Sequence, residues 1–144
     1  MCTPSTFARL GPLLVLCAVL PVLTGCNSHG WPERYPTRFK VLYEGKPPVG
    51  ATVVLHPADK IGDPSVVPSR GEVAEDGTVN FSTYTTDDGV PAGEYIVSAF
   101  WMDPNGRTTN NRLPAKYLDP KTSGFKVRIE KSDNQLATIN LTKD

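Results

Sequence analysis

The stretch PAGEYIVSAFW, residues 91–101, decides the fold that this sequence predicts. From residue 94 to residue 102 the chain is rich in apolar, aromatic and β-branched side chains, which favour a β-strand. Apolar residues occur on both faces of this strand, and such strands usually lie in the middle of a sheet. We therefore predict a long central strand over residues 94–102, with Tyr95 and Val97 in the core.

Shorter strands are predicted on both sides of this segment, because apolar and polar residues alternate and turn residues separate the runs. They cover residues 39–43, 51–56, the two arms of a hairpin within 71–86, 125–129 and 136–141. The pair Asp76-Gly77 predicts the tight turn of that hairpin, since glycine accepts a positive φ. About seven short strands, with no long segment at the helical period, predict an all-β fold: a single antiparallel β-sandwich.

The alternation also indicates which side chains share the apolar faces of these strands. Outside the central strand they are Phe39, Val41, Tyr43, Val79, Phe81, Thr83, Phe125, Val127, Ile129, Ala137, Ile139 and Leu141. Residues 125–129 alternate cleanly with charged neighbours, a pattern typical of an edge strand.

The first 25 residues have the order of a secretory signal. A short polar segment with Arg9 precedes an apolar run over residues 10–23, and two small residues follow. The apolar run is shorter than the roughly 20 residues that span a bilayer, and it contains two prolines, which remove helix hydrogen bonds. We therefore expect a signal peptide over residues 1–25 rather than a permanent membrane span.

The sequence VLTGCNS, residues 22–28, places Cys26 directly after this segment. Leu23-Thr24-Gly25-Cys26 resembles the lipobox of bacterial lipoproteins. The resemblance implies that the Cys26 thiol receives a diacylglyceryl group, that a peptidase then cuts before Cys26, and that the new amino terminus is acylated. A thiolate is nucleophilic enough to form such a thioether, and several acyl chains make a durable anchor. The alternative is an ordinary signal with a chance cysteine.

The other cysteines, Cys2 and Cys17, lie in the segment that would be removed. The mature chain, residues 26–144, would therefore contain no disulfide, thiol nucleophile or cysteine metal site. Its length suits one domain. We expect residues 26–37, which contain glycine and prolines without periodicity, to be a tether, and residues 38–144 to be the sandwich.

Three segments together resemble a known group of domains: GKPPVGATVVLHP at residues 45–57, EDGTVNFSTY at 75–84 and PAGEYIVSAFW at 91–101. Their order resembles that of carboxypeptidase-regulatory-like and transthyretin-like sandwich domains. The resemblance implies a prealbumin-like sandwich with an Ig-like Greek key topology. The matched residues have structural roles at turns and in the core, so the resemblance implies a fold and no reaction.

The sequence lacks the patterns that several activities require. There is no G-x-S-x-G motif for a serine hydrolase. A zinc site is poorly supplied by two histidines, His29 in the expected tether and His56 at a strand end. No aspartates have the spacing of a calcium loop. We therefore expect no enzyme activity, no metal and no cofactor.

Charge and location define the expected partners. Fifteen Lys and Arg balance fifteen Asp and Glu, so no basic excess indicates nucleic-acid binding. The remaining partners are the membrane, through the lipid on Cys26, and an unknown protein or glycan. Asn27 is not the Asp that retains some lipoproteins at the inner membrane, which favours the outer membrane.

The long connection over residues 103–124 is the candidate contact surface, because long loops in small domains are often functional. The candidate binding residues are Trp101, Arg107, Arg112, Lys116 and Tyr117. The alternative is that Leu113, Tyr117 and Leu118 only fix the connection to the sandwich.

These features predict a non-catalytic, lipid-anchored binding or structural module of the cell envelope, facing the periplasm or the cell surface and contacting another protein. The alternative function is carbohydrate binding, with sugar rings stacked on Trp101, Tyr84 or Tyr117. The opposing interpretation of Trp101 is a core or sheet-face residue, since its neighbours on the strand are apolar.

Overall fold

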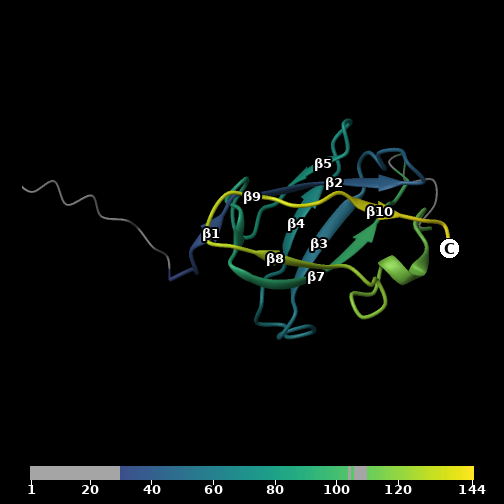
Figure 1. Ribbon diagram of the computed structural model, residues 1–144. Helices are drawn as coiled ribbons and strands as arrows, with labels where there is room; N and C mark the ends of the chain where they lie inside the picture. The colour runs from purple at the N-terminus through teal and green to yellow at the C-terminus, as the bar shows by residue number, and fades with distance from the viewer. Residues whose placement is uncertain (1–29, 104, 106–109) are drawn as a thin grey trace, which may run out of the picture. The chain divides into compact units, whose positions relative to one another are not determined.

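The computed structural model describes residues 30–103, 105 and 110–144. The signal peptide expected over residues 1–25, and the expected lipid-bearing Cys26, lie outside the described residues. From Trp31 to Asp144 the chain forms one unit, whose regular elements are β-strands and a single short 3-10 helix among the described residues (Figure 1). The all-β fold predicted from the sequence is confirmed.

Seven strands correspond to those that the alternation predicts. They are β2 (Thr37–Tyr43), β3 (Thr52–Pro57), β4 (Ser69–Glu72), β5 (Thr78–Asn80), β7 (Gly93–Phe100), β8 (Lys126–Ile129) and β10 (Ile139–Leu141). The described residues add three two-residue strands and one 3-10 helix, which are β1 (Arg34–Tyr35), β6 (Val90–Pro91), β9 (Asn134–Gln135) and η1 (Ala115–Tyr117).

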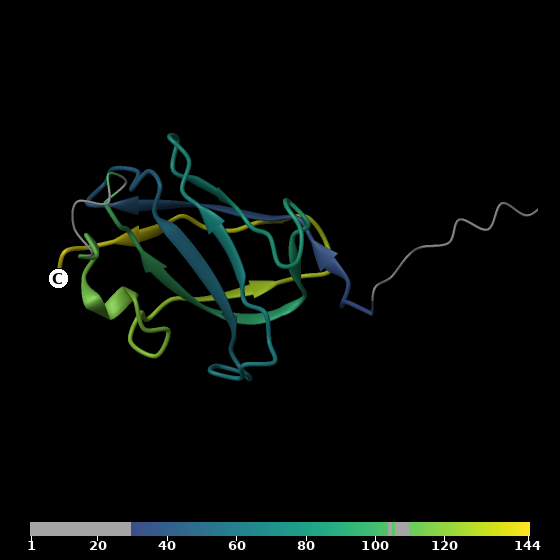
Figure 2. The same cartoon turned by 180° about the vertical axis from the view of Figure 1, so that it is seen from behind.

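One sheet is antiparallel throughout, in the order β4-β3-β7-β8. Figure 2 shows β4, β3 and β7 of this sheet from behind. The strand predicted to be central, β7, lies between β3 and β8, and β8 lies at the edge as its alternation predicts. Tyr95, Val97 and Ala99 of β7 are buried.

The second sheet is built around β2. This strand pairs antiparallel with β5 on one side and parallel with β9 and β10 on the other. Asn134 is paired with Thr37 at the start of β2, and Leu141 with Tyr43 at its end. The last two strands, β9 and β10, therefore run in the same direction as β2, and the pairing between the other described strands is antiparallel.

The predicted hairpin joins the two sheets. Its first arm, β4, pairs with β3, whereas its second arm, β5, pairs with β2. Isolated bridges from Arg70 to Ser82 and from Val73 to Val79 connect the arms, and Gly77 turns the chain with a φ of 84°. One side of the sandwich is thereby closed by backbone hydrogen bonds.

The core lies between the sheets and consists of the inward side chains. Its members include Phe39, Val41, Val53, Leu55, Val79, Phe81, Tyr95, Val97, Ile129, Ile139 and Leu141. Phe39 and Phe81 have ring centroids 4.9 Å apart. The expectation for Ala137 is wrong: this residue is exposed, because β10 begins only at Ile139.

The folded unit begins before the position that the sequence indicates. Trp31 already belongs to it, and β1 pairs with β6 through Arg34 with Pro91 and Tyr35 with Val90. Residues 31–37 are therefore part of the domain and not of a tether. Of the tether expected over residues 26–37, residues 26–29 lie outside the described residues.

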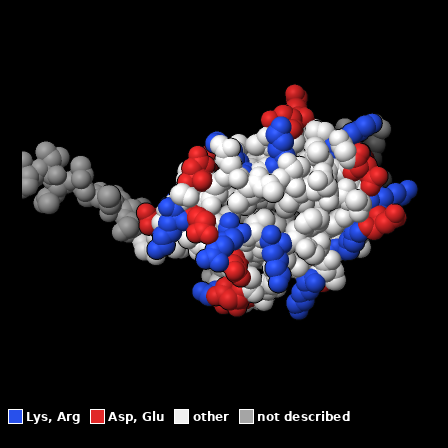
Figure 3. All heavy atoms as spheres, in the orientation of Figure 1, with Lys and Arg blue, Asp and Glu red and all other residues white. Residues whose placement is uncertain are grey.

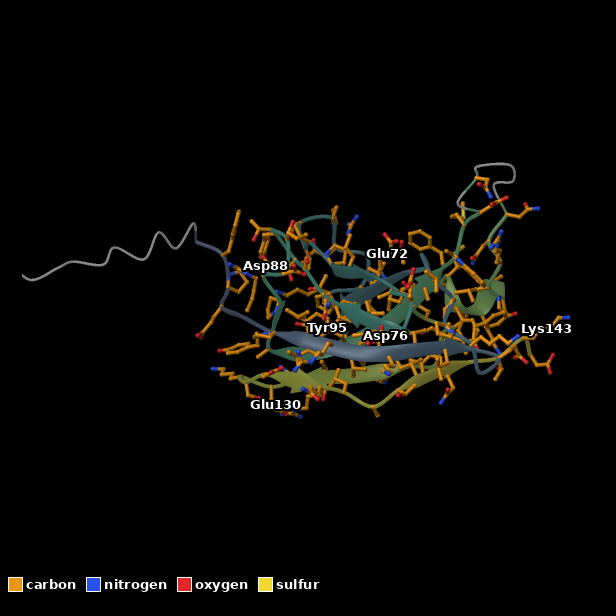
Figure 4. All side chains as sticks on the ribbon, turned by 90° about the horizontal axis from the view of Figure 1, so that it is seen from above. Glu72, Asp76, Asp88, Tyr95, Glu130 and Lys143 are labelled. Carbon is orange, nitrogen blue, oxygen red and sulfur yellow. The ribbon has the colours of Figure 1, made fainter. Side chains whose placement is uncertain are left out.

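Aromatic and charged side chains cluster at two ends of the sandwich. The Trp31 end is formed by Trp31, Arg34, Tyr84 and Asp88. The Trp101 end is formed by the loop at 44–50, by residues 101–103 and 110–118, and by the C-terminal residues 142–144. Figure 4 shows Asp88 at one end of the sandwich and Lys143 at the other.

Positive and negative side chains are interleaved over the face in Figure 3, which agrees with the balanced composition.

Candidate functional site

The Trp101 end contains a tryptophan and an arginine packed against each other. The guanidinium carbon of Arg112 lies 5.1 Å from the centroid of the Trp101 ring, a distance typical of a cation–π contact. The Trp101 Nε1 donates a hydrogen bond to the Val49 carbonyl at 2.9 Å. Arg112 also approaches Asp103, with Nη2 and Oδ1 3.4 Å apart. Two of the predicted binding residues therefore lie together, and loop 44–50 holds the tryptophan in place.

Backbone hydrogen bonds fix the base of the long connection. The Arg112 N–H donates to the Trp101 carbonyl at 2.8 Å. Asn111 Oδ1 accepts from the N–H of Trp101 at 2.7 Å and from the N–H of Leu113 at 3.2 Å. The strand end and the returning chain are therefore held side by side at Trp101, which gives Arg112 a defined position.

Tyr117, a predicted binding residue, is buried and cannot form a contact surface. Its ring stacks on Phe125 with centroids 6.0 Å apart, and its hydroxyl accepts a hydrogen bond from the Thr142 N–H. The Lys116 Nζ lies 5.0 Å from the Tyr117 ring centroid. Burial raises the pKa of Tyr117, but hydrogen bonds with Thr142 and the neighbouring Lys116 charge outweigh burial and lower it below its ordinary value.

The alternative interpretation of the long connection, in which its apolar residues only fix it to the sandwich, is therefore correct in part. Leu113 and Tyr117 are buried and fix residues 113–117 to the sandwich. Leu118, which the same alternative includes, is 53% exposed and does not. Arg107 lies outside the described residues.

Exposed apolar side chains at this end were missed by the sequence reasoning. Val49 is 47% exposed and Met102 is 44% exposed, and both adjoin Trp101, Met102 along the chain and Val49 through the indole hydrogen bond. We call Val49, Trp101, Met102 and Arg112 the Trp101 surface. Val49 lies in a predicted turn and belongs to no strand face. An apolar residue at such a position is the only feature of the sequence that could have indicated its exposure.

The Trp31 end contains a second aromatic cluster. Trp31 and Tyr84 stack with ring centroids 4.6 Å apart and planes inclined by 9°. The guanidinium carbon of Arg34 lies 5.6 Å from the Trp31 centroid and 5.3 Å from the Tyr84 centroid. The cluster combines residues that are far apart in the sequence, so no local pattern indicated it.

Asp88 connects this cluster to the rest of the domain through an ion pair and hydrogen bonds. Its Oδ2 forms an ion pair with Arg34 Nε at 3.0 Å, and its carboxylate accepts hydrogen bonds from the backbone N–H groups of Thr83, Tyr84 and Thr85. Burial raises the pKa of Asp88, but these N–H groups and the Arg34 charge outweigh burial and lower it. Asp88 therefore stays ionised and holds Arg34 and the Tyr84 backbone together.

A groove of about 700 Å³ lies beside the Trp31–Tyr84 stack. Pro32 and Tyr84 line it on the side of the stack, and Val66 and Val67 of the loop after β3 also line it. Tyr95 contributes to the wall; burial raises the pKa of its hydroxyl to about 12, and this hydroxyl donates to the Pro91 carbonyl at 2.8 Å. The lining of the groove thus combines these neutral and apolar groups with the charged side chains of Asp59, Lys60 and Glu94.

A histidine and a serine are paired on the outer face of the β3–β7 sheet. His56 Nε2 and Ser98 Oγ are 2.8 Å apart, and burial lowers the pKa of His56. A base beside a hydroxyl is the start of a nucleophilic site, which also needs an orienting group and oxyanion donors. Among the described residues no carboxylate is bonded to His56. The sequence placed His56 at a strand end and gave no indication of this pairing.

The described residues hold no group of three or more His, Cys, Asp and Glu side chains that could bind a metal. Within the same part of the chain, no helix is long and apolar enough to cross a membrane. Comparison with protein-family models, curated proteins and solved structures finds no match to this chain.

Proposed function

We propose that this chain is a non-catalytic, lipid-anchored module of the bacterial cell envelope that binds a protein partner through the Trp101 surface. The anchor is the lipid expected on Cys26, in the outer membrane by preference, with the domain facing the periplasm or the cell surface. The partner binds at the end of the sandwich that lies away from the anchor.

The observation that carries the proposal is the position of the exposed apolar side chains. Val49 and Met102 flank the Trp101–Arg112 pair. Loop 44–50, which contains Val49, is hydrogen-bonded to Lys143, and Figure 4 shows Lys143 at the end of the sandwich opposite Asp88. Tryptophan and arginine, together with tyrosine, are enriched among the residues that contribute most of the binding energy at protein interfaces, and the contacts around them exclude water when a partner binds. A chain tethered near Trp31 would present this surface away from the membrane.

The arrangement of His56 and Ser98 gives little support to a hydrolase. Their side chains project from the outer face of a sheet whose backbone N–H groups take part in strand pairing. Such a face has few N–H groups left to stabilise an oxyanion. The pair is better explained as a hydrogen bond that satisfies the buried Ser98 hydroxyl.

Carbohydrate binding is the weaker candidate, because the three candidate rings do not form one platform. Tyr117 is buried, Tyr84 is stacked on Trp31, and Trp101 lies at the other end under Arg112. A sugar-binding site requires exposed ring faces close to polar groups in one place.

The proposal is tested by isolating the full-length protein with its partners from its own membranes in detergent after cross-linking. Wild type is compared with Val49→Asp and Arg112→Glu, and with Lys126→Glu as a charge-reversal control on the exposed edge strand β8. We expect one stoichiometric protein that is lost with the first two variants and retained with the control. A partner retained by all variants would move the interface elsewhere, and glycan without protein would favour the carbohydrate alternative.

The anchor is tested on the same material by intact mass. We expect a chain that begins at Cys26 and carries diacylglyceryl and acyl groups. A chain that retains residues 1–25, or an unmodified Cys26, would contradict the lipoprotein proposal.

A further inference from the structure

The Trp31 end is fixed to the domain by three independent sets of contacts. Trp31 stacks on Tyr84, Arg34 is paired with Asp88, and β1 is hydrogen-bonded to β6. Residue 31 therefore has a defined place on the sandwich. A tether that begins at Cys26 would end here, at residue 31, and not at residue 38.

This short tether limits how far the domain can stand from a membrane. Five Cα steps separate Cys26 from Trp31, and they reach at most about 17 Å when fully extended. The eight residues of β7 alone extend over about 26 Å. The Trp31 end therefore has to stay near the bilayer that holds the lipid, whereas the Trp101 end lies further away.

The side chains at this end suit the interfacial layer of a bilayer. Trp31 is 41% exposed, and Val67, which lines the groove together with Pro32, is 45% exposed. Tryptophan and tyrosine are enriched at membrane interfaces, because their rings have an apolar body and a polar edge. Three more exposed large apolar side chains of the described residues, Val49, Met102 and Leu118, lie at the Trp101 end.

The charges near the stack give this end no basic excess. The groove beside it is lined by one basic side chain, Lys60, and by two acidic ones, Asp59 and Glu94. Arg34 is bound to Asp88, and Arg38 approaches Asp133 at 3.5 Å. No cluster of unpaired basic side chains is formed by these residues, so attraction to anionic headgroups is weak. A contact with lipid here depends on the aromatic and aliphatic groups and is insensitive to salt.

We propose that the Trp31 end is a docking surface for the lipid bilayer itself, with Trp31 in the interfacial layer and Val67 facing the same surface. This inference rests on the proposed lipid anchor at Cys26. The Arg34–Asp88 pair holds the Trp31 segment on the sandwich, so that Trp31 meets the bilayer as part of the folded domain. Figure 4 shows Asp88 and Lys143 at opposite ends of the sandwich, and the Lys143 end, which includes the Trp101 surface, then points away from the membrane.

The experiment uses the full-length lipidated protein reconstituted into phosphatidylcholine vesicles, with or without lipids brominated on the acyl chain near the headgroup. The chain has two tryptophans. Trp101→Phe reports Trp31 alone, and Trp31→Phe reports Trp101 alone. Subtracting the Trp31→Phe emission from that of the wild type gives the Trp31 signal without altering residue 101, in case Trp101→Phe disturbs folding.

We expect brominated lipid to quench Trp31 and leave Trp101 unchanged, and acrylamide in the water to quench Trp101 more than Trp31. High salt should not reverse the quenching of Trp31. Trp31 emission that is insensitive to brominated lipid, in protein whose mass confirms lipid on Cys26, would overturn the docking surface and leave the anchor intact. A mass without lipid on Cys26 would overturn the anchor and this inference together.

Discussion

The hydroxyl of Tyr117 accepts a hydrogen bond from the backbone N–H of Thr142 at 2.9 Å. This bond links the 3-10 helix η1 to the residue directly after β10. The long connection, which the sequence indicated as a contact surface, is thereby attached to the last strand of the second sheet. Its central part consequently acts as a structural element, and the exposed part of the Trp101 end is formed around it.

Tyr117→Phe should lower the free energy of unfolding by about 0.5–1.5 kcal/mol, the net contribution of a typical hydrogen bond, because the Thr142 N–H loses its partner while the ring remains in the core. The measurement is urea unfolding followed by circular dichroism. Tyr43→Phe is the matched control: its ring packs against Trp101, and its hydroxyl has no hydrogen bond among the described residues. Equal effects of both substitutions would contradict the assigned role of the Tyr117 hydroxyl.

Asn111→Ala should destabilise the protein by about 1–3 kcal/mol, because the N–H groups of Trp101 and Leu113 both lose their acceptor. Asn110→Ala, at the exposed neighbouring position, should change stability by less than about 0.5 kcal/mol. Thermal unfolding of the two variants gives the comparison. If Asn111→Ala were as stable as wild type, Asn111 would not be the residue that holds the base of the connection.

Gly89→Ala should detach the Trp31 end from the domain. Gly89 has a φ of 84°, and an added Cβ would lie 2.3 Å from the Tyr35 carbonyl oxygen in β1. Gly62 has a φ of 83° with no heavy atom within 4 Å of the added Cβ. Both substitutions strain the backbone, because alanine disfavours a positive φ. Only Gly89→Ala also forces the new Cβ against the β1 backbone, which should lower the free energy of unfolding by a further amount of about 1–3 kcal/mol.

The test for Gly89 compares both alanine variants by urea unfolding and by acrylamide quenching of Trp31 in a Trp101→Phe background. We expect the Gly89 variant to unfold at lower urea and to expose Trp31 more than the Gly62 variant does. Indistinguishable variants would show that β1 does not depend on this close approach.

Acidification from pH 7.5 to about pH 5.5 should lower stability through His56. Burial lowers the pKa of this imidazole in the fold, so below about pH 6.5, its ordinary value, the unfolded chain binds more protons than the folded one. The stability is therefore lost as the pH falls. Urea midpoints across this range give the slope.

His56→Gln should flatten this pH dependence, and His29→Gln, which changes the other histidine of the chain, should leave it unchanged. Stability that rises on acidification would be incompatible with a buried, neutral His56. Carboxylates contribute mainly at lower pH, so the chosen range separates the histidine from them.

Much of the fold could be predicted because alternation is a local property of a strand. Phe39, Val41, Val79, Phe81 and Ile139 are buried as their spacing indicates. Ala137 was misplaced because one small apolar residue in phase with its neighbours does not determine where a strand begins. The strand starts at Ile139, where pairing with Val41 becomes possible.

The candidate site could be predicted only in part. Trp101 and Arg112 are neighbours in space. Arg112 was selected for its place in the long connection, and Trp101 for its aromatic ring at the end of the strand before that connection. Tyr117 has the same residue-type signal, yet it is buried, because Phe125 and Thr142 happen to be placed around it. The Trp31–Tyr84 stack and the His56–Ser98 pair join residues distant in sequence, for which no local pattern exists.

The sequence by itself determined an all-β chain, the position of its main strands, the inward face of most of them and the lipobox-like segment at Cys26, because each depends on residues close together in the chain. Only the tertiary structure decided that β9 and β10 run parallel to β2, that the arms of one hairpin belong to different sheets, and that residues 31–37 join the domain. Strand partners and the side chains that meet at the two ends of the sandwich depend on contacts between residues that are distant in sequence. These contacts are decided by the packing of the whole core.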